Sequence, residues 1–159
     1  MATKRLSTSA ALIGGTLVAG SCDITFAILF WWFRAGVGPT RVLQSVAAGL
    51  IGRTAAISGG TKTALLGLVL HYFIAFCFVL FYWLMAKALP VLRRHAVILG
   101  STYGLGIYFV MNYVVIPLSA TKRGPFNMLS FVLSLIVHAF LIGLPAALFA
   151  KAALPESES

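Results

Sequence analysis

The sequence predicts an all-α membrane protein: a bundle of four transmembrane helices with an amphipathic interfacial helix between the first and second spans. Of the 159 residues, 60% are hydrophobic and 9% are charged, whereas about 25% of the residues in a soluble domain are charged. Four stretches reach the length of about 20 residues that a helix needs to cross a hydrocarbon core of ~30 Å. This composition excludes a soluble globular protein, and we expect residues 1–159 to form a single membrane domain.

The spans are expected to be helices, because backbone groups in lipid must form their hydrogen bonds within the segment. The first span ends with Trp31 and Trp32, residues typical of a membrane interface. The third span is closed by Pro117, and Pro145 is expected to kink or break the fourth near its end. The predicted spans are residues 10–33, 63–86, 96–118 and 128–150.

The long connection between the first two spans predicts a helix over residues 39–57, with Pro39 in its first turn. Gly59-Gly60 ends it before the second span. Such a helix can lie flat in the membrane interface with its basic side on headgroups, or it can be a connector that packs on the mouth of the bundle. At 100° per residue one face carries Val42, Leu43, Val46, Ala47 and Leu50, and the other carries Arg41, Gln44, Ser45 and Gly52.

The formal net charge of +9 comes from twelve Lys and Arg against three acids. Four spans put both termini on one side of the membrane, and six basic residues then fall on each side, so the positive-inside rule ties. The pair Arg93-Arg94 in a tight loop favours cytoplasmic termini, while the tie also permits dual topology with antiparallel dimers. Because the charges are spread over both faces, we expect anionic lipid headgroups as partners and no nucleic acid. The headgroup contacts are assigned to Arg41, Arg53, Arg93 and Arg94, and the acidic tail at 155–159 is expected to be disordered.

Each predicted span carries one strongly polar residue. An acid at the centre of a span costs about 2.5 to 3.5 kcal/mol on insertion scales, so it requires an explanation. Up-and-down topology places Asp23 and His138 near the middle of the membrane, with the other two slightly nearer the long connection. We expect Asp23, His71, Asn112 and His138 to form one solute- or proton-binding site, with Tyr72, Cys77, Tyr108 and Tyr113 as its neighbours.

Alternative interpretations of this cluster stay open. An Asp–His pair can exchange protons near neutral pH, as a proton-coupled carrier or relay requires. Alternatively, the polar groups only hold the four helices together, as in a structural or accessory subunit. A metal site from Asp23, His71 and His138 would have suitable ligand types, but no HxxxH or CxxC spacing supports it. We expect no metal and no cofactor.

Signatures of soluble enzymes are missing from the sequence. It contains no phosphate-binding Gly loop, no Gly-x-Ser-x-Gly and no paired carboxylates, since Asp23 is the only acid before residue 156. We therefore expect a non-enzymatic protein that binds or passes a small solute or proton through the polar cluster. A membrane-embedded enzyme acting on lipid would need His71 or His138 as a base at headgroup level, and the midplane depth of His138 argues against it.

Gly100 and Gly104 form a GxxxG motif, which lets the third helix approach a neighbour closely. That neighbour is either another helix of the same bundle or a second copy of the chain in a homodimer.

A series of motifs carries a family resemblance. It comprises GPTRVLQS at 38–45, GLIG at 49–52, Gly59-Gly60, His71-Tyr72, Tyr82, Pro90, Tyr103-Gly104 and MNYVVIPLSA at 111–120. Together these resemble a group of small uncharacterised four-span proteins of the bacterial inner membrane. The pattern of a span-opening His, a loop Pro, a later Pro that ends the third span and a His in the fourth is more distantly similar to the YagU-like proteins. The resemblance covers roughly residues 34–145. It implies this fold and a multi-pass location in the bacterial inner (plasma) membrane, and it implies no activity, substrate or cofactor.

Overall fold

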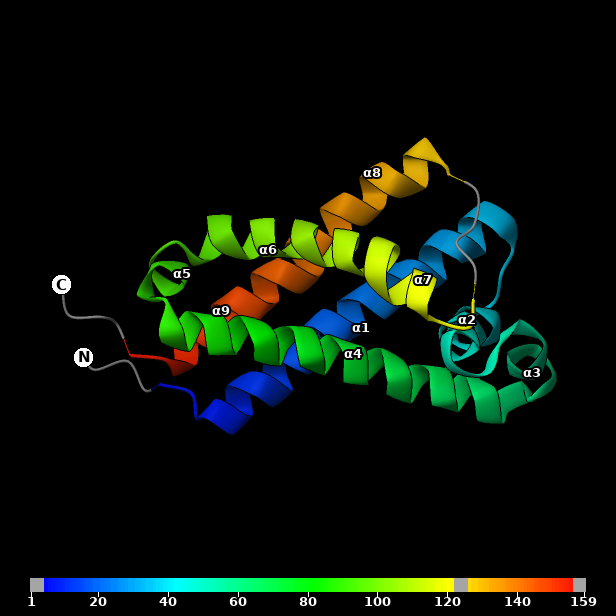
Figure 1. Cartoon of the computed structure of the whole chain (residues 1–159), viewed down its shortest axis with the longest axis horizontal. Coiled ribbons are helices and arrows are strands. Elements are labelled where there is room, and N and C mark those ends of the chain that lie inside the picture. The colour runs from blue at the N-terminus through cyan, green and yellow to red at the C-terminus, as the bar shows by residue number, and fades with distance from the viewer. Residues whose placement is uncertain (1–4, 122–125, 156–159) are drawn as a thin grey trace.

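The computed structural model describes residues 5–121 and 126–155, and within these ranges it contains helices and no strand. Four helices are long and apolar enough to cross a membrane, which confirms the four-span bundle (Figure 1). The tail beyond residue 155 and three of the basic residues counted above, Lys4, Lys122 and Arg123, lie outside the described residues. The four spans are α1 (Thr8–Ala35), α4 (Gly60–Ala88), the third span (Ala96–Leu118) and the fourth span (Met128–Ala153).

The ends of the helices follow from local capping. Ser7 begins α1, because its side chain accepts a hydrogen bond from the backbone N–H of Ala10 at 3.2 Å. Gly36 ends α1 at a φ of 63°, a left-handed conformation that glycine adopts without strain. Gly60, with a φ of 60°, separates α4 from the preceding helix as the Gly-Gly pair predicts. Each observed span contains its predicted range, since charged and small residues flank every apolar core.

Both the third and the fourth spans widen into π-helix in mid-course, which the sequence analysis did not predict. In each, the π-helical turn stops two residues before a proline, Pro117 or Pro145. Proline lacks an N–H and its ring displaces the carbonyl four residues back, so the preceding turn relaxes to wider hydrogen bonding. The helices therefore continue past these prolines. The segments are α6 (Ala96–Val110), η1 (Met111–Val115) and α7 (Ile116–Leu118), then α8 (Met128–Val137), η2 (His138–Gly143) and α9 (Leu144–Ala153).

The fourth span is central, because α9 packs against α1, α4 and α6. Glycines let it approach α6 closely: a Cβ on Gly104 would overlap the His138 carbonyl, and one on Gly143 would overlap the Gly100 carbonyl. The GxxxG motif of α6 thus contacts the fourth span of the same chain, one of the two neighbours considered above. A homodimer stays a prediction.

The connection between the first two spans forms two helices, α2 (Pro39–Ile51) and α3 (Arg53–Ser58). The single helix predicted over 39–57 is wrong in this respect, because Gly52 has a φ of 78° and breaks it. Helix α2 packs across α4, where a Cβ on Gly67 would overlap the carbonyl of Leu43. Two residues differ from the predicted faces. Gln44, expected on the polar face, is buried and its amide donates to the Gly60 carbonyl at 3.0 Å. Leu50, expected on the apolar face, is 61% exposed.

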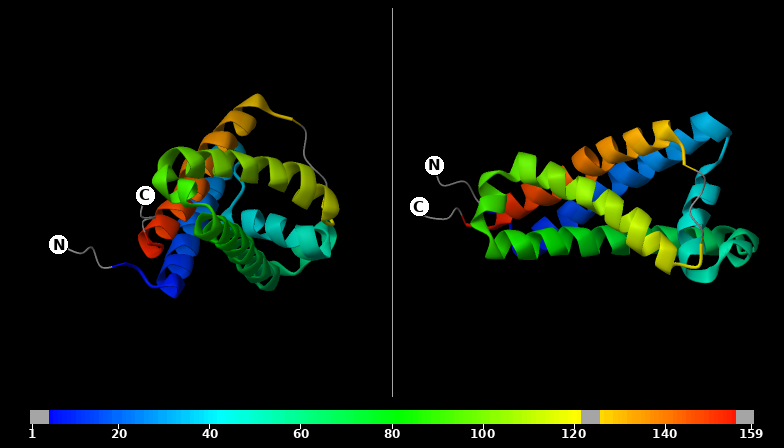
Figure 2. Two further views of the ribbon diagram at one scale, coloured as in Figure 1. Left: turned by 60° about the vertical axis from the view of Figure 1, so that its left-hand side comes forward. Right: turned by 45° about the horizontal axis from the view of Figure 1, so that its top comes forward.

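Both termini lie at one end of the bundle, which we call the terminal end, and α2 and α3 lie at the other, the α2 end (Figure 1). The N–H of Leu6 donates to the Ala152 carbonyl at 3.0 Å, tying the first and last helices together at the terminal end. The short helix α5 (Pro90–Arg94) turns the chain there. Figure 2 shows that the helices lie close at the terminal end and diverge toward the α2 end, where α8 leans away from α7.

Candidate functional site

The space between the diverging helices forms two adjoining cavities at the α2 half of the bundle. An outer cavity of about 810 Å³ lies among the end of α1, α2, η1, α7 and α8. An inner cavity of about 210 Å³ lies deeper, among α1, α2, α4, α6 and η2. The two adjoin, because six residues line both: Trp31, Ser45, Val46, Ile74, Met111 and His138.

Three of the four predicted site residues line the inner cavity. Asp23 comes from α1, His71 from α4 and His138 from η2, although they are far apart in the sequence. The helical period brings Asp23 onto the α1 face that the inner cavity exposes, with Gly20 before it and Ala27 after it. The fourth residue, Asn112, lines the outer cavity instead. The predicted single cluster is therefore divided between two adjoining spaces.

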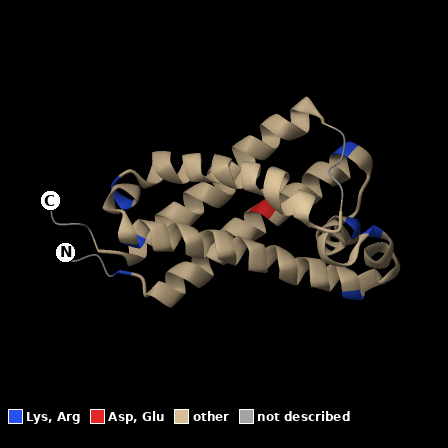
Figure 3. Ribbon diagram, viewed as in Figure 1, with Lys and Arg blue, Asp and Glu red and all other residues tan. Residues whose placement is uncertain are grey.

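Asp23 is half-buried and is the only carboxylate within residues 5–121 and 126–155. In that part of the chain no hydrogen bond or ion pair involves its side chain. Figure 3 shows the basic residues at both ends of the bundle and the single acidic position between them. The carboxylate thus lines a cavity with its hydrogen-bonding capacity unused by the described residues, the state expected of a group that binds a proton, water or a solute.

His71 connects two spans. Its Nε2 lies 2.8 Å from the carbonyl oxygen of Gly20, which can only accept, so Nε2 carries the hydrogen and donates. The missing side chain at Gly20 makes this approach possible, since a Cβ there would lie 2.8 Å from the Tyr72 ring. With Nε2 engaged, a neutral His71 retains only Nδ1 as an acceptor.

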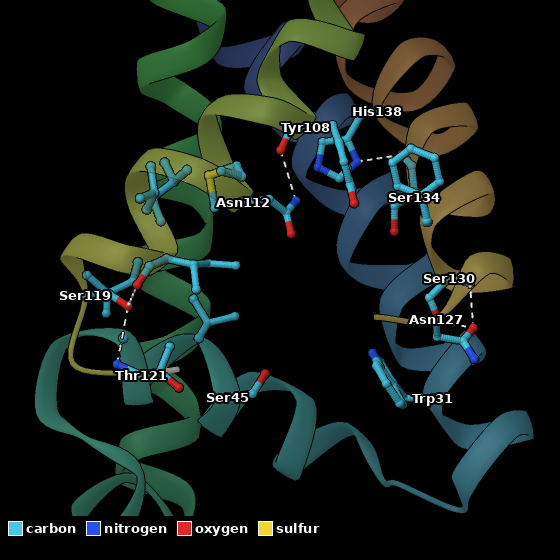
Figure 4. A pocket seen from close by; sticks show the side chains of 18 of the residues that line it. Trp31, Ser45, Tyr108, Asn112, Ser119, Thr121, Asn127, Ser130, Ser134 and His138 are labelled. Atoms are coloured by element: carbon cyan, nitrogen blue, oxygen red, sulfur yellow. Dashed lines mark hydrogen bonds between the residues drawn. The ribbon is translucent and has the colours of Figure 1, made fainter. Parts of the chain in front are cut away.

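His138 is the first residue of η2 and lines both cavities. Its Nδ1 donates to the Ser134 carbonyl, one turn earlier in α8, at 2.8 Å, which leaves Nε2 as the acceptor of the neutral ring (Figure 4). The Tyr108 ring meets it edge-on, with centroids 5.6 Å apart and planes at 90°. Close packing of Gly104 on the His138 backbone holds this part of η2 against α6, one turn from Tyr108.

Asn112 lies in η1 on the wall of the outer cavity, and its Nδ2 donates to the Tyr108 carbonyl at 2.9 Å (Figure 4). Its side-chain oxygen remains available to the cavity. This bond to the carbonyl four residues back is made within its own helix, as is that of His138. Neither of these two side-chain hydrogen bonds therefore joins two spans, although the His138 ring packs edge-on against Tyr108 of the third span.

Of the four expected neighbours, Tyr108 alone lines either of these two cavities. Tyr72 instead pairs its hydroxyl with that of Ser21 on α1 at 2.7 Å. Cys77 is exposed on α4, and Tyr113 is 60% exposed on η1.

Several cavity residues were assigned other roles or none from the sequence. Trp31 was read as an interfacial anchor and Ser45 as a headgroup-facing residue of the connecting helix, yet both line both cavities. The polar rim of the outer cavity near the start of α8 was not predicted either. An Asn followed three residues later by Ser is a pattern typical of a helix N-cap and could have indicated it, since Asn127 accepts a hydrogen bond from the Ser130 N–H at 3.0 Å. Polar residues of the outer cavity include Ser119, Thr121, Asn127, Ser130 and Ser134 (Figure 4).

Three of the four arginines assigned to headgroups are exposed: Arg41 and Arg53 at the α2 end and Arg94 at the terminal end. Arg93 is half-buried and points inward, because its Nη1 donates to the Ala86 carbonyl in the last turn of α4 at 2.6 Å. It caps a helix C-terminus, as basic side chains often do.

No group of three or more His, Cys, Asp or Glu side chains able to hold a metal ion occurs among residues 5–121 and 126–155. No family model matches the chain, and neither a curated protein nor a solved structure matches it. The geometry of the two cavities therefore carries the functional argument.

Proposed function

We propose that this multi-pass protein binds a small solute or proton in the inner cavity and exchanges it through the outer cavity, without catalysing a reaction. The bacterial inner membrane is its proposed location, with both termini in the cytoplasm and Arg41, Arg53 and Arg94 on anionic headgroups. The α2 end then faces the opposite side of the membrane. The proposal rests on the residues that the cavities expose, since no similar protein supplies a function.

One observation carries this proposal: the only described carboxylate, Asp23, lines the inner cavity and has no hydrogen-bonding partner among the described residues. Burying an unpaired ionisable group in the membrane is costly, so its presence requires a compensating role. The inner cavity of about 210 Å³ is far larger than the roughly 10–15 Å³ that admits one water molecule. Water in this cavity would hydrate the carboxylate and connect it to the two histidines.

Contacts between spans support the structural alternative for His71 and, through its ring contact with Tyr108, for His138. His71 joins α4 to α1 through the Gly20 carbonyl, so it contributes to holding the helices together. Asn112 and His138 donate within their own helices, and Asp23 has no partner in the described chain. A role limited to joining helices therefore leaves Asp23 unexplained.

The proposal is tested by proton flux in proteoliposomes that contain a trapped pH-sensitive dye and are energised by a potassium diffusion potential. The wild-type protein should pass protons, and Asp23→Asn should reduce the flux to that of empty liposomes. Because Asp23 makes no hydrogen bond that the amide would lose, the melting temperature of Asp23→Asn should change little.

Thr25→Val is the matched control, since Thr25 is exposed on the outer surface of the same helix. It should retain wild-type flux. A wild-type flux no greater than that of empty liposomes would refute proton passage. A marked loss of thermal stability in Asp23→Asn, with flux unchanged, would favour the structural role.

A further inference from the structure

The inner cavity carries one unbalanced negative charge. Its titratable side chains are Asp23 from α1, His71 from α4 and His138 from η2, while α2 and α6 contribute none. Each neutral histidine donates its one N–H to a backbone carbonyl, so neither N–H is available to the carboxylate. An ionised Asp23 therefore gives the cavity a net charge of −1, and a monovalent cation would neutralise it.

The nearest cation among the outer-cavity residues does not provide this balance. Arg34 lines the outer cavity eleven residues after Asp23 on α1, which is about 16 Å along the helix axis. It is exposed at the α2 end, where salt screens charges beyond roughly 8 Å. Asp23, deeper in the bundle, is less screened than Arg34.

The side chains that line the inner cavity offer few ligands to a small inorganic cation. Hard cations take about six to eight oxygen ligands, whereas the inner cavity offers side-chain oxygens from Asp23 and Ser45 only. Its other walls are mostly apolar or aromatic. The apolar walls of the inner cavity include Ile24, Val42, Ile74, Phe78, Ile107 and Ile142.

A cation with an apolar body matches these walls. The Trp31 side chain lines both cavities, and an indole face binds weakly hydrated ammonium groups. The outer cavity adds Tyr108, Phe126 and Phe131, and its volume of about 810 Å³ falls in the range of roughly 300–1,000 Å³ typical of small-molecule sites.

We infer that the two cavities bind a hydrophobic organic cation, with its ammonium group against Asp23 in the inner cavity and its apolar body in the outer cavity. This inference rests on the proposed function and names its substrate class. A proton and the cation compete for the same carboxylate, so binding one releases the other. Protonation of His71 or His138 would also weaken cation binding, because it adds positive charge to the same cavity.

Titration calorimetry of the purified protein tests the inference with benzyltrimethylammonium, compared with neutral benzyl alcohol and anionic phenylacetate. The quaternary ammonium should bind more tightly than both, and acidification should weaken its binding. Asp23→Asn should lower its affinity at least about tenfold. Thr25→Val should bind as the wild type does.

A second variant, Ala27→Phe, keeps the carboxylate and fills the inner cavity that Ala27 lines. It too should lose affinity for the ammonium probe, so the inference does not depend on Asp23→Asn alone. Equal binding of the three probes, or unchanged cation binding in both variants, would overturn the ligand class. If proton flux still depended on Asp23 in that case, the proposed function would stand, and only the organic cation would be rejected as its ligand. Asp23-dependent cation binding without proton flux would instead support the ligand class and refute proton passage.

Discussion

The two halves of the bundle are built from different residues. At the terminal end the core consists largely of alanines with a few aromatic rings, and glycine backbones touch one another across α6 and the fourth span. At the α2 half the cavities lie between large apolar side chains and the polar rim of the outer cavity, and η1 and the first residue of η2 form part of their walls. Small residues close one half, while bulky residues line the cavities of the other. Alanines of the terminal-end core include Ala86, Ala96, Ala146, Ala147 and Ala150.

Tight packing and cavity space are therefore separated along the same helices. The fourth span belongs to both halves: α9 is its packed part, and η2 carries His138 into the cavities. Gly104 packs tightly on the backbone of His138, the residue of η2 that lines both cavities, so the closed half ends at this residue. Changes in the packed half should therefore alter stability, and changes in the open half should alter binding.

The largest effect on stability is expected for Gly104→Ala. The added Cβ would overlap the backbone of His138 and Ala139, which cannot move aside as a flexible side chain can. Overpacking costs about 1–3 kcal/mol, and we expect the upper part of this range or more. Thermal unfolding in detergent, followed by circular dichroism, measures it.

The matched control is Gly106→Ala, on the same helix two residues away, where an added Cβ meets nothing within 4 Å. It should be neutral, or should stabilise the protein by up to about 1 kcal/mol, since alanine favours helix over glycine. Equal melting temperatures for the two variants would show that the glycine contacts do not determine the packing of this half.

A smaller effect of opposite sign is expected for Pro117→Ala. Restoring the N–H permits a regular helix through η1, so the melting temperature should rise. The outer-cavity wall around Asn112 and Val115 would then rotate, and affinity for benzyltrimethylammonium should fall several-fold. Pro90→Ala, in the short α5 helix at the terminal end, is the control and should leave affinity unchanged. Unaltered binding by Pro117→Ala would remove the link between the π-helical turn and the cavity.

The smallest expected effect is the difference in stability between the His71→Ala and His138→Ala variants. His71→Ala removes a hydrogen bond between two spans and should cost roughly 0.6–1.5 kcal/mol. His138→Ala removes a bond within one helix and should cost less. Thermal melts at one pH compare them directly. A reversed order would assign the helix-joining role to His138.

The sequence was sufficient for the four spans, because span length and apolar composition are set by the membrane and by local residues. It was also sufficient to bring Asp23, His71 and His138 to one cavity, since their depths follow from the span limits. It did not show that Asn112 would line a separate outer cavity, because that cavity depends on how the helices diverge and on the π-helical turn before Pro117. The burial of Gln44 could not be predicted either, because its hydrogen-bonding partner is the Gly60 carbonyl, sixteen residues later in the chain. Such features depend on packing between segments.

The central claim is that Asp23 is a free carboxylate in a cavity that a solute can enter. Peptide mapping by mass spectrometry after reaction with dicyclohexylcarbodiimide, an apolar reagent for protonated carboxyl groups, tests it most directly. We expect modification of Asp23 in the wild-type protein, and we expect benzyltrimethylammonium to suppress it while leaving any modification of Glu156 and Glu158 unchanged. An unmodified Asp23, or modification that the cation does not affect, would contradict the claim.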